Sequence, residues 1–314
     1  MKPKTIVLPH DRISELIDKE GNFSERLKRS IDLWAAALMN DDGLTHPVSD
    51  DGIVLKAQIK AKENGVFVGQ KVIEHISNFW APSLIFKWFF NESSEVSKGD
   101  ILAEVTGKQL QLLKLERPIL NILGRLSGIA TSSRRWTCSS QIPIAATRKT
   151  TWGLLDKLAV NSGGALTHRL DREDALMIKE NDLCANYFNL DQEDRIKYAL
   201  EDLLIEESSS FVIIEVTNKK QAIMAAKTWK KLDMNQPLTI MLDNIDVINC
   251  NEIINTIKNL NLDENLFFEA SGGIKFENID QWNDSLVNVI STSSIHRGTR
   301  PLDISLLILE DSNV

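Results

Sequence analysis

The sequence predicts an α/β protein in two parts: a small α+β part, and then a barrel of alternating strands and helices. In the first third of the chain, apolar and polar residues alternate with period two between helical segments, which is typical of half-buried strands. From residue 142 onward, six short apolar runs are separated by helical patterns, as in a parallel sheet with right-handed crossovers. No GxGxxG motif follows the first of these runs, so a dinucleotide-binding fold loses its best support. A closed or nearly closed α/β barrel is expected, although six strands are fewer than the usual eight.

The first part should combine helices with a small sheet. Helices are predicted over residues 12–19, 30–39, 70–79 and 116–136, and strands over 53–62, 66–68, 87–90 and 101–105. Asn64-Gly65 is typical of a hairpin turn between two of these strands. The helix over 116–136 is expected to begin at Arg117-Pro118, since proline is tolerated in a first helical turn. The domain boundary is placed in this helix. It gives domains of residues 1–129 and 130–294, with residues 295–314 packing back on the first.

Composition and charge exclude several classes of protein. The 314 residues carry a net charge of −8, which argues against broad nucleic-acid binding. No apolar run approaches the roughly 20 residues of a membrane span, and the first residues lack an apolar signal-peptide core, so a cytoplasmic protein is expected. The three cysteines lie far apart without a CxxC pair, which favours buried, reduced thiols over disulfides or a zinc site.

Polar side chains gather where the barrel strands are predicted to end. The strands are expected over residues 142–147, 175–178, 211–216, 238–242, 266–270 and 286–291. At or just after their ends stand Arg148, Lys149, Lys179, Glu215, Asp243, Ser271, Gly272, Gly273, Ser293 and Ser294, while His168 and Arg169 precede the second strand. Ligands bind at the carboxyl ends of strands in α/β proteins, so these cations indicate an anionic substrate.

The other strand ends indicate phosphate and metal. Glycines such as Gly272 and Gly273 let backbone N–H groups approach a phosphate closely. Glu215 and Asp243 supply hard oxygen ligands suited to Mg²⁺, which commonly bridges substrate phosphates. Asp243 alone would more simply be a helix N-cap, and Ser271–Gly273 a tight turn. Several such ends around one barrel mouth favour a phosphorylated substrate, a divalent cation and a second anion.

Motifs along the chain resemble those of the quinolinate phosphoribosyltransferase family, the carboxylating nicotinate-nucleotide pyrophosphorylases. The resemblance extends from about Asp41 to Leu307. Its most specific parts are Glu116-Arg117 with LSGIAT (126–131), TRKTT (147–151), the SGG…HR segment (162–169), IKEN (178–181), IEV (214–216), MLDN (241–244), EASGGI (269–274) and PLDISL (301–306). The resemblance implies an N-terminal α/β sandwich followed by an open α/β barrel of six or seven strands. It also implies synthesis of nicotinate mononucleotide, CO₂ and pyrophosphate from quinolinate and phosphoribosyl pyrophosphate with Mg²⁺, in the route to NAD.

The resemblance also implies roles for individual residues. Arg148, His168, Arg169 and Lys179 would hold the quinolinate carboxylates, and Arg117 would do so from the neighbouring subunit of a homodimer or higher homo-oligomer. Lys149, Glu215 and Asp243 would engage phosphoribosyl pyrophosphate and its Mg²⁺, directly or through water. The phosphate would be bound by Ser271, Gly272, Gly273 and Ser293. Lys149, Lys179, Glu215 and Asp243 are the expected catalytic residues.

Several positions depart from the family pattern. Ala146 stands where an aspartate is usual, Thr167 where an asparagine is usual, and Asp182 where a histidine is usual. The loop after the last barrel strand contains Ser293 instead of a glycine, and His296 lies one position early. Two alternatives therefore stay open. The chain could be a paralogous phosphoribosyltransferase acting on another pyridine or azole carboxylate, or a non-catalytic barrel that only binds ligand.

Overall fold

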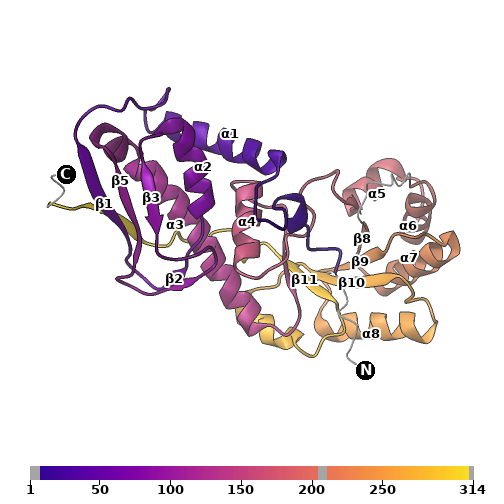
Figure 1. Ribbon diagram of the computed structural model, residues 1–314. Coiled ribbons are helices and arrows are strands. Elements are labelled where there is room, and N and C mark those ends of the chain that lie inside the picture. Colours follow the sequence, from indigo (N-terminus) through magenta and orange to yellow (C-terminus); the bar gives the residue numbers. More distant parts are fainter. Residues whose placement is uncertain (1–7, 204–210, 311–314) are drawn as a thin grey trace. The chain divides into compact units, whose positions relative to one another are not determined.

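A computed structural model describes residues 8–203 and 211–310 (Figure 1). The described residues form two compact units. We call the first, from residues 1–12, 136–148 and 166–294, the parallel-sheet unit. The second, from residues 13–135, 149–165 and 295–314, is the antiparallel-sheet unit. Over the described ranges, every helix is too short or too polar to cross a lipid bilayer.

The parallel-sheet unit is built on six parallel strands in the order β6-β11-β10-β9-β8-β7. These strands are β6 (Ile144–Ala146), β7 (Leu176–Ile178), β8 (Val212–Val216), β9 (Leu238–Asp243), β10 (Leu266–Ser271) and β11 (Val289–Thr292). Among the described residues, the edge strands β6 and β7 do not pair with each other, so the sheet is an open half-barrel. The predicted α/β class and the open barrel of six strands are confirmed, and a closed barrel is excluded.

Apolar residues explain why these short segments form strands. The burial of β8, β9 and β11 is almost continuous along each strand, as expected for a sheet covered on both faces. Helices α7 (Lys219–Leu232) and α8 (Val247–Asn259) follow β8 and β9, and α6 (Gln192–Glu201) precedes β8 (Figure 1). The segment over 276–282 is a 3₁₀-helix, η2 (Phe276–Trp282). The short helix α5 (Glu180–Asn186), directly after β7, was not expected from the sequence.

The antiparallel-sheet unit contains a four-stranded sheet in the order β12-β1-β5-β3. Its strands are β1 (Val54–Ala61), β3 (Ile85–Trp88), β5 (Ile101–Lys108) and β12 (Ile304–Ile308). The predicted hairpin at Asn64-Gly65 is wrong. Strand β1 pairs with β5 on one edge and β12 on the other, so the next segment has no free edge of β1 to pair with. Instead β2 (Gly65–Val66) pairs with β4 (Glu95–Val96) in a separate small ladder.

The helices of this unit start and end differently from the predictions. Helix α1 runs over Glu25–Asp41 with Ser24 as its N-cap, and α2 spans Gln70–Trp80 as expected. The predicted helix near 12–19 is only a short 3₁₀ turn, η1 (Ile13–Glu15). Helix α3 runs over Gln109–Ser139, so the expected start at Arg117-Pro118 is wrong and Pro118 lies inside the helix. The preceding turns are held by tertiary contacts: buried Gln111 bonds to Ser83 and to the carbonyl of Val48.

Helix α4 (Leu154–Ser162) and the loop before it belong to the antiparallel-sheet unit, although residues 149–165 were expected in the barrel domain. Asp156 of α4 forms an ion pair with Arg125 of α3. Trp152 stacks on Trp34 of α1, with ring centroids 6.0 Å apart. These contacts explain the assignment. Strand β12, from the C-terminal segment, pairs with β1 of the same unit.

Candidate active site

Three polar side chains lie at the C-terminal ends of neighbouring strands of the half-barrel. We call this side of the sheet its carboxyl edge. Glu215 is the penultimate residue of β8, Asp243 ends β9 and Ser271 ends β10. These strands are neighbours, and Ser271 is in register with Asp243. The parallel sheet therefore brings together the predicted carboxylates and the predicted phosphate-binding segment.

Lys179 joins these side chains from the adjacent strand. It follows β7 directly and is the N-cap residue of α5. Its Nζ lies 3.2 Å from Oε2 of Glu215, and the lysine side chain is about half exposed, with 48 % of its surface accessible. Asp182 accepts the backbone N–H of Lys179 at 3.0 Å and so fixes the start of α5. The residue that departs from the family pattern here thus orients a predicted site lysine.

The loops after β9 and β10 approach each other closely at Asn244 and Gly272. Asn244 donates its backbone N–H to the carbonyl of Ser271 at 2.9 Å and its side-chain amide to Asp243 at 2.8 Å. Gly272 has φ +85°, and a Cβ there would lie 2.5 Å from the Asn244 side-chain oxygen. A larger residue at 272 would clash and be strained, so glycine is required for this close approach. A polar cavity of about 320 Å³ lies beside it, lined by residues that include Asn218, Lys219 and Asn244.

The loop after β11 is tied to the loop after β10. Thr292 donates its hydroxyl to the carbonyl of Ile274 at 3.0 Å, and its Oγ1 accepts the N–H of Ser294 at 3.1 Å. Ser293, between them, is half-buried. The structure therefore places Ser293 at the same edge as Ser271, without the glycine that the family pattern has there.

Positive charge gathers near the segment before β7. Arg148 is exposed, whereas Arg169 is buried and donates Nη1 to the carbonyl of Ala175 at 3.0 Å. Burial, and then the charges of Arg148 and Arg172, lower the pKa of Arg169 to about 10. Arg169 stays protonated at neutral pH. An anion bound here would relieve the repulsion among these guanidinium groups.

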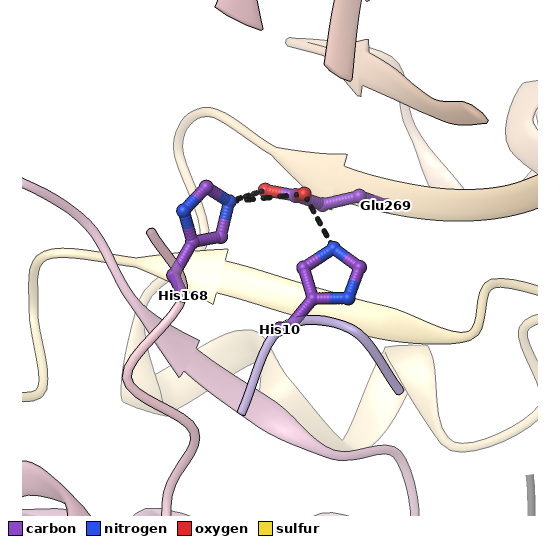
Figure 2. Close-up of side chains that lie close together, drawn as sticks. All are labelled: His10, His168 and Glu269. Atoms are coloured by element: carbon purple, nitrogen blue, oxygen red, sulfur yellow. Dashed lines mark hydrogen bonds and ion pairs between the residues drawn. The ribbon is translucent and has the colours of Figure 1, made fainter. Parts of the chain in front are cut away.

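His168 lies in a buried cluster that the sequence did not predict (Figure 2). Its Nε2 lies 3.1 Å from both carboxylate oxygens of Glu269, and Nε2 of His10 lies 3.1 Å from Oε2 of the same carboxylate. All three residues are at most 3 % exposed. Burial alone would raise the pKa of Glu269, but His168 and His10 outweigh it and hold that pKa below its ordinary range. Glu269 is therefore an ionised, buried carboxylate with two imidazole partners.

Glu269 stands inside the apolar run of β10, and a buried charge needs a partner. The sequence could therefore have indicated that Glu269 has a polar partner in the core. No comparable signal marked His10. The side-chain nitrogen and oxygen atoms of His10, His168 and Glu269 that could bind a metal lie within 4.8 Å of one another. Within the described ranges, no other group of three such side chains is close enough to hold a metal ion. The proposed substrate-binding role of His168 stays a prediction.

The antiparallel-sheet unit carries the remaining predicted residues. Lys149 is exposed on the loop before α4. Arg117 has 61 % of its side chain exposed and lines a cavity of about 480 Å³, as do Arg125 and Trp152. Asp156 was missed by the sequence reasoning. It binds Arg125 through both carboxylate oxygens and also accepts two backbone N–H groups of the loop that follows Lys149.

His296 is fully buried, and neither ring nitrogen has a hydrogen-bond partner in the described part of the chain. Burial, and then the charge of Lys157, lower the pKa of His296 to about 4. It is therefore neutral at neutral pH. The cysteines form no disulfide; Cys250 is buried, but Cys138 and Cys184 are exposed, contrary to expectation.

Comparisons with known proteins agree with this geometry. The model of the quinolinate phosphoribosyl transferase C-terminal domain matches residues 129–307, and that of the N-terminal domain matches residues 42–127. A probable carboxylating nicotinate-nucleotide pyrophosphorylase of Methanothermobacter thermautotrophicus is 32% identical over 275 residues, covering 85% of this chain and 93% of the relative. One of Bacillus subtilis is 30% identical over 256 residues, covering 80% and 82%. The solved structure of NadC from Streptococcus pyogenes has a TM-score of 0.74 and 25% identity, covering 90% of this chain and 98% of that one.

Proposed function

The chain belongs to the quinolinate phosphoribosyl transferase family, and we propose that it transfers phosphoribose from phosphoribosyl pyrophosphate to quinolinate with loss of CO₂. The products are nicotinate mononucleotide, pyrophosphate and CO₂, on the route to NAD. The observation that carries the proposal is the carboxyl edge of the half-barrel. Lys179, Glu215, Asp243 and Ser271 stand there in strand order, while Arg148 follows β6 and Arg169 precedes β7 of the same sheet.

Quinolinate is a dicarboxylate, and the cations near β7 suit it. Arg148, Arg169 and Lys179 supply charge-assisted donors, and an arginine fork matches a carboxylate in two bonds. Burial, and then repulsion from Arg148 and Arg172, lower the pKa of Arg169, and this repulsion favours capture of an anion. His168 completes this set as a proposed binding residue.

The other half of the site suits phosphoribosyl pyrophosphate with Mg²⁺. Glu215 and Asp243 lie on adjacent strands, and two carboxylates are what Mg²⁺ ordinarily takes from a protein when substrate phosphates supply further oxygens. The donor set therefore fits this ion, held directly or through water. When bound, Mg²⁺ would neutralise charge on the pyrophosphate. The amides of Ser271, Gly272 and Gly273, with Ser293, are proposed to bind the phosphate.

The chemistry needs positioning and charge rather than an acid–base pair. The ring nitrogen attacks the anomeric carbon while pyrophosphate leaves, and positive charge develops on the ribose ring. Glu215 and Asp243, at the ends of β8 and β9, are proposed to stabilise that charge, and Lys149 is proposed to stabilise the leaving group. When CO₂ leaves, the electron pair of the broken bond stays on the ring carbon, where the adjacent cationic ring nitrogen stabilises it, and that carbon then takes up a proton.

We also propose a homodimer, or a higher homo-oligomer, in which Arg117 reaches the substrate of the neighbouring subunit. Arg117 is mostly exposed and borders a large cavity, which leaves its guanidinium available for an anion. A cytoplasmic location is proposed as well, because the three cysteines form no disulfide.

The open alternative, a paralogue with another acceptor, rests on Ala146, Thr167 and Asp182. Two of these residues make hydrogen bonds to the backbone. Thr167 accepts the N–H of Arg12 at 2.7 Å, and Asp182 accepts the N–H of Lys179 at the start of α5. Ala146 is fully buried in β6, where a carboxylate would need a partner. These departures therefore concern the support of the site more than its direct ligands.

A substrate panel tests the proposal. The purified protein is incubated with phosphoribosyl pyrophosphate, Mg²⁺ and one of quinolinate, nicotinate or an azole carboxylate, and pyrophosphate is measured. Turnover of quinolinate in preference to the others is expected. Turnover of another acid alone would support the paralogue, and binding without pyrophosphate release would support a ligand-binding barrel.

A further inference from the structure

The segment over residues 8–12 lies outside the residues that the family models match, which begin at residue 42. It nevertheless belongs to the parallel-sheet unit and makes buried contacts there. His10 is fully buried, with its ring 5.0 Å from that of Phe211 and 5.4 Å from that of His168. A segment outside the matched family models thus adds a buried side chain to the parallel-sheet unit.

Two further bonds fasten this segment to the chain around His168. The backbone N–H of Arg12 is donated to Oγ1 of Thr167 at 2.7 Å. The Nε of Arg12 is donated to Oδ1 of Asp174 at 2.9 Å, and the other oxygen of Asp174 accepts the N–H of Leu170. The side chain of Asp174 is only 3 % exposed, so its pairing with Arg12 is worth more than a surface pair.

The backbone of His168 itself needs support. Its φ is +56°, in the left-handed region that residues with a Cβ seldom adopt. Such a conformation persists where the surroundings hold it, and it is common at functional sites. Here Thr167 is held by Arg12 and the ring of His168 by Glu269.

The carboxylate of Glu269 fixes the ring state of both histidines. An ionised carboxylate only accepts hydrogen bonds, so each imidazole must carry a proton on the Nε2 that faces Glu269 (Figure 2). The cluster could instead be a metal site. However, metal-bound imidazoles normally donate their second N–H to an acceptor, and Nδ1 of His10 has no such acceptor among the described residues. The geometry points to direct hydrogen bonds.

We propose that His10 and Glu269 are positioning residues for the quinolinate site: together they hold the His168 ring in one orientation with Nε2–H donated to Glu269, so that the doubly protonated ring can donate Nδ1–H to a quinolinate carboxylate. The proposal rests on the function proposed above, since it assigns His168 to the quinolinate carboxylates. Glu269 provides the acceptor from within β10. His10 bonds to Oε2, one of the two oxygens that His168 also contacts, and so restrains the carboxylate beside His168.

The test combines His10→Phe with His10→Gln. Phenylalanine fills the space but removes the donor, whereas the glutamine amide retains an N–H for Glu269. For His10→Phe we expect the KM for quinolinate to rise roughly tenfold, because one hydrogen bond to a charged group is lost. The KM for phosphoribosyl pyrophosphate should stay unchanged. His10→Gln should recover most of this loss. The matched control is His75→Phe, which removes another histidine–carboxylate pair, that of His75 with Asp32, and should change neither KM.

Ring ¹⁵N spectra of histidine-labelled protein provide a readout that does not depend on activity. In the wild type, the His168 signals should show protonated Nε2, and His10→Phe should shift them while circular dichroism stays native. Unchanged His168 signals, or a loss of thermal stability with both KM values unchanged, would overturn the proposal. Stoichiometric metal in the wild type that His10→Phe abolishes would overturn it too. If the wild type does not turn over quinolinate, the proposed function fails, whereas the spectra still decide whether His10 and Glu269 set the state of His168.

Discussion

Asp156 holds the loop that follows Lys149 against α3, and replacing it by asparagine tests how this part of the site is supported. The carboxylate is fully buried and makes four hydrogen bonds: two from Arg125, at 3.1 and 2.9 Å, and two from the backbone N–H groups of Thr151 and Trp152, at 2.7 and 3.1 Å. Asparagine has nearly the same shape but only one acceptor oxygen and no charge. In the place of Oδ2 that oxygen could still accept from Arg125 and the loop, but the amide NH₂ would then face Nε of Arg125, which now donates to Oδ1.

The cost follows from what Asp156→Asn leaves behind. Arg125, whose side chain is only 16 % exposed, would lose its counter-charge. Removing one partner of a buried ion pair costs about 3–5 kcal/mol, and the remaining amide oxygen offsets part of it, so we expect a loss of about 3 kcal/mol in the free energy of unfolding. For a chain of 314 residues that corresponds to a drop of roughly 4–5 °C in the unfolding midpoint.

Thermal unfolding followed by tryptophan fluorescence is a suitable assay, because Trp152 stacks on Trp34 within this unit. Glu25→Gln, which removes an exposed partner of Lys28, is the matched control and should leave the midpoint where it is. The variant should also lose activity, since the loop carries Lys149. A midpoint shift no larger than that of the control would refute the reasoning.

Three further results are expected. Glu215→Ala should abolish phosphoribosyl transfer while the circular dichroism spectrum stays native; undiminished activity would exclude the role given to it. Mixing inactive Arg117→Ala with inactive Lys149→Ala protein should restore part of the activity, and none would return if each subunit worked alone. The third result concerns pH. His296 has a folded-state pKa of about 4, below the ordinary 6.5, so the unfolded chain binds its proton first and stability falls as pH drops below 6.5. Between pH 7.5 and 5.5 this lowers the free energy of unfolding measured in urea by about 1 kcal/mol, and His296→Phe should lose correspondingly less; equal losses would contradict the assignment.

Hydrophobic patterns were enough to predict the parallel sheet, because its strands are buried apolar runs bounded by polar ends. They also placed Glu215, Asp243 and Ser271 at one edge, since parallel neighbours end on the same side. The patterns failed where tertiary contacts override local preference. Asn64-Gly65 suits a hairpin, but both edges of β1 are taken by distant strands. Pro118 suits a helix start, but contacts of the preceding residues extend α3 through it.

The supporting residues of the site could not be predicted, because their partners are far away in the sequence. His10 meets Glu269 across 259 residues, and Arg125 meets Asp156 across 31. A charged residue within an apolar strand indicates that it has a partner, but the sequence does not identify that partner.

Release of labelled CO₂ from carboxyl-labelled quinolinate tests the central claim most directly. The purified protein, with phosphoribosyl pyrophosphate and Mg²⁺, should release CO₂ and pyrophosphate in equal amounts and form as much nicotinate mononucleotide. Omitting phosphoribosyl pyrophosphate should stop CO₂ release completely, because the ring nitrogen becomes an electron acceptor only after it is alkylated. Pyrophosphate release from phosphoribosyl pyrophosphate with another acid as the acceptor, and no CO₂ from quinolinate, would contradict the account.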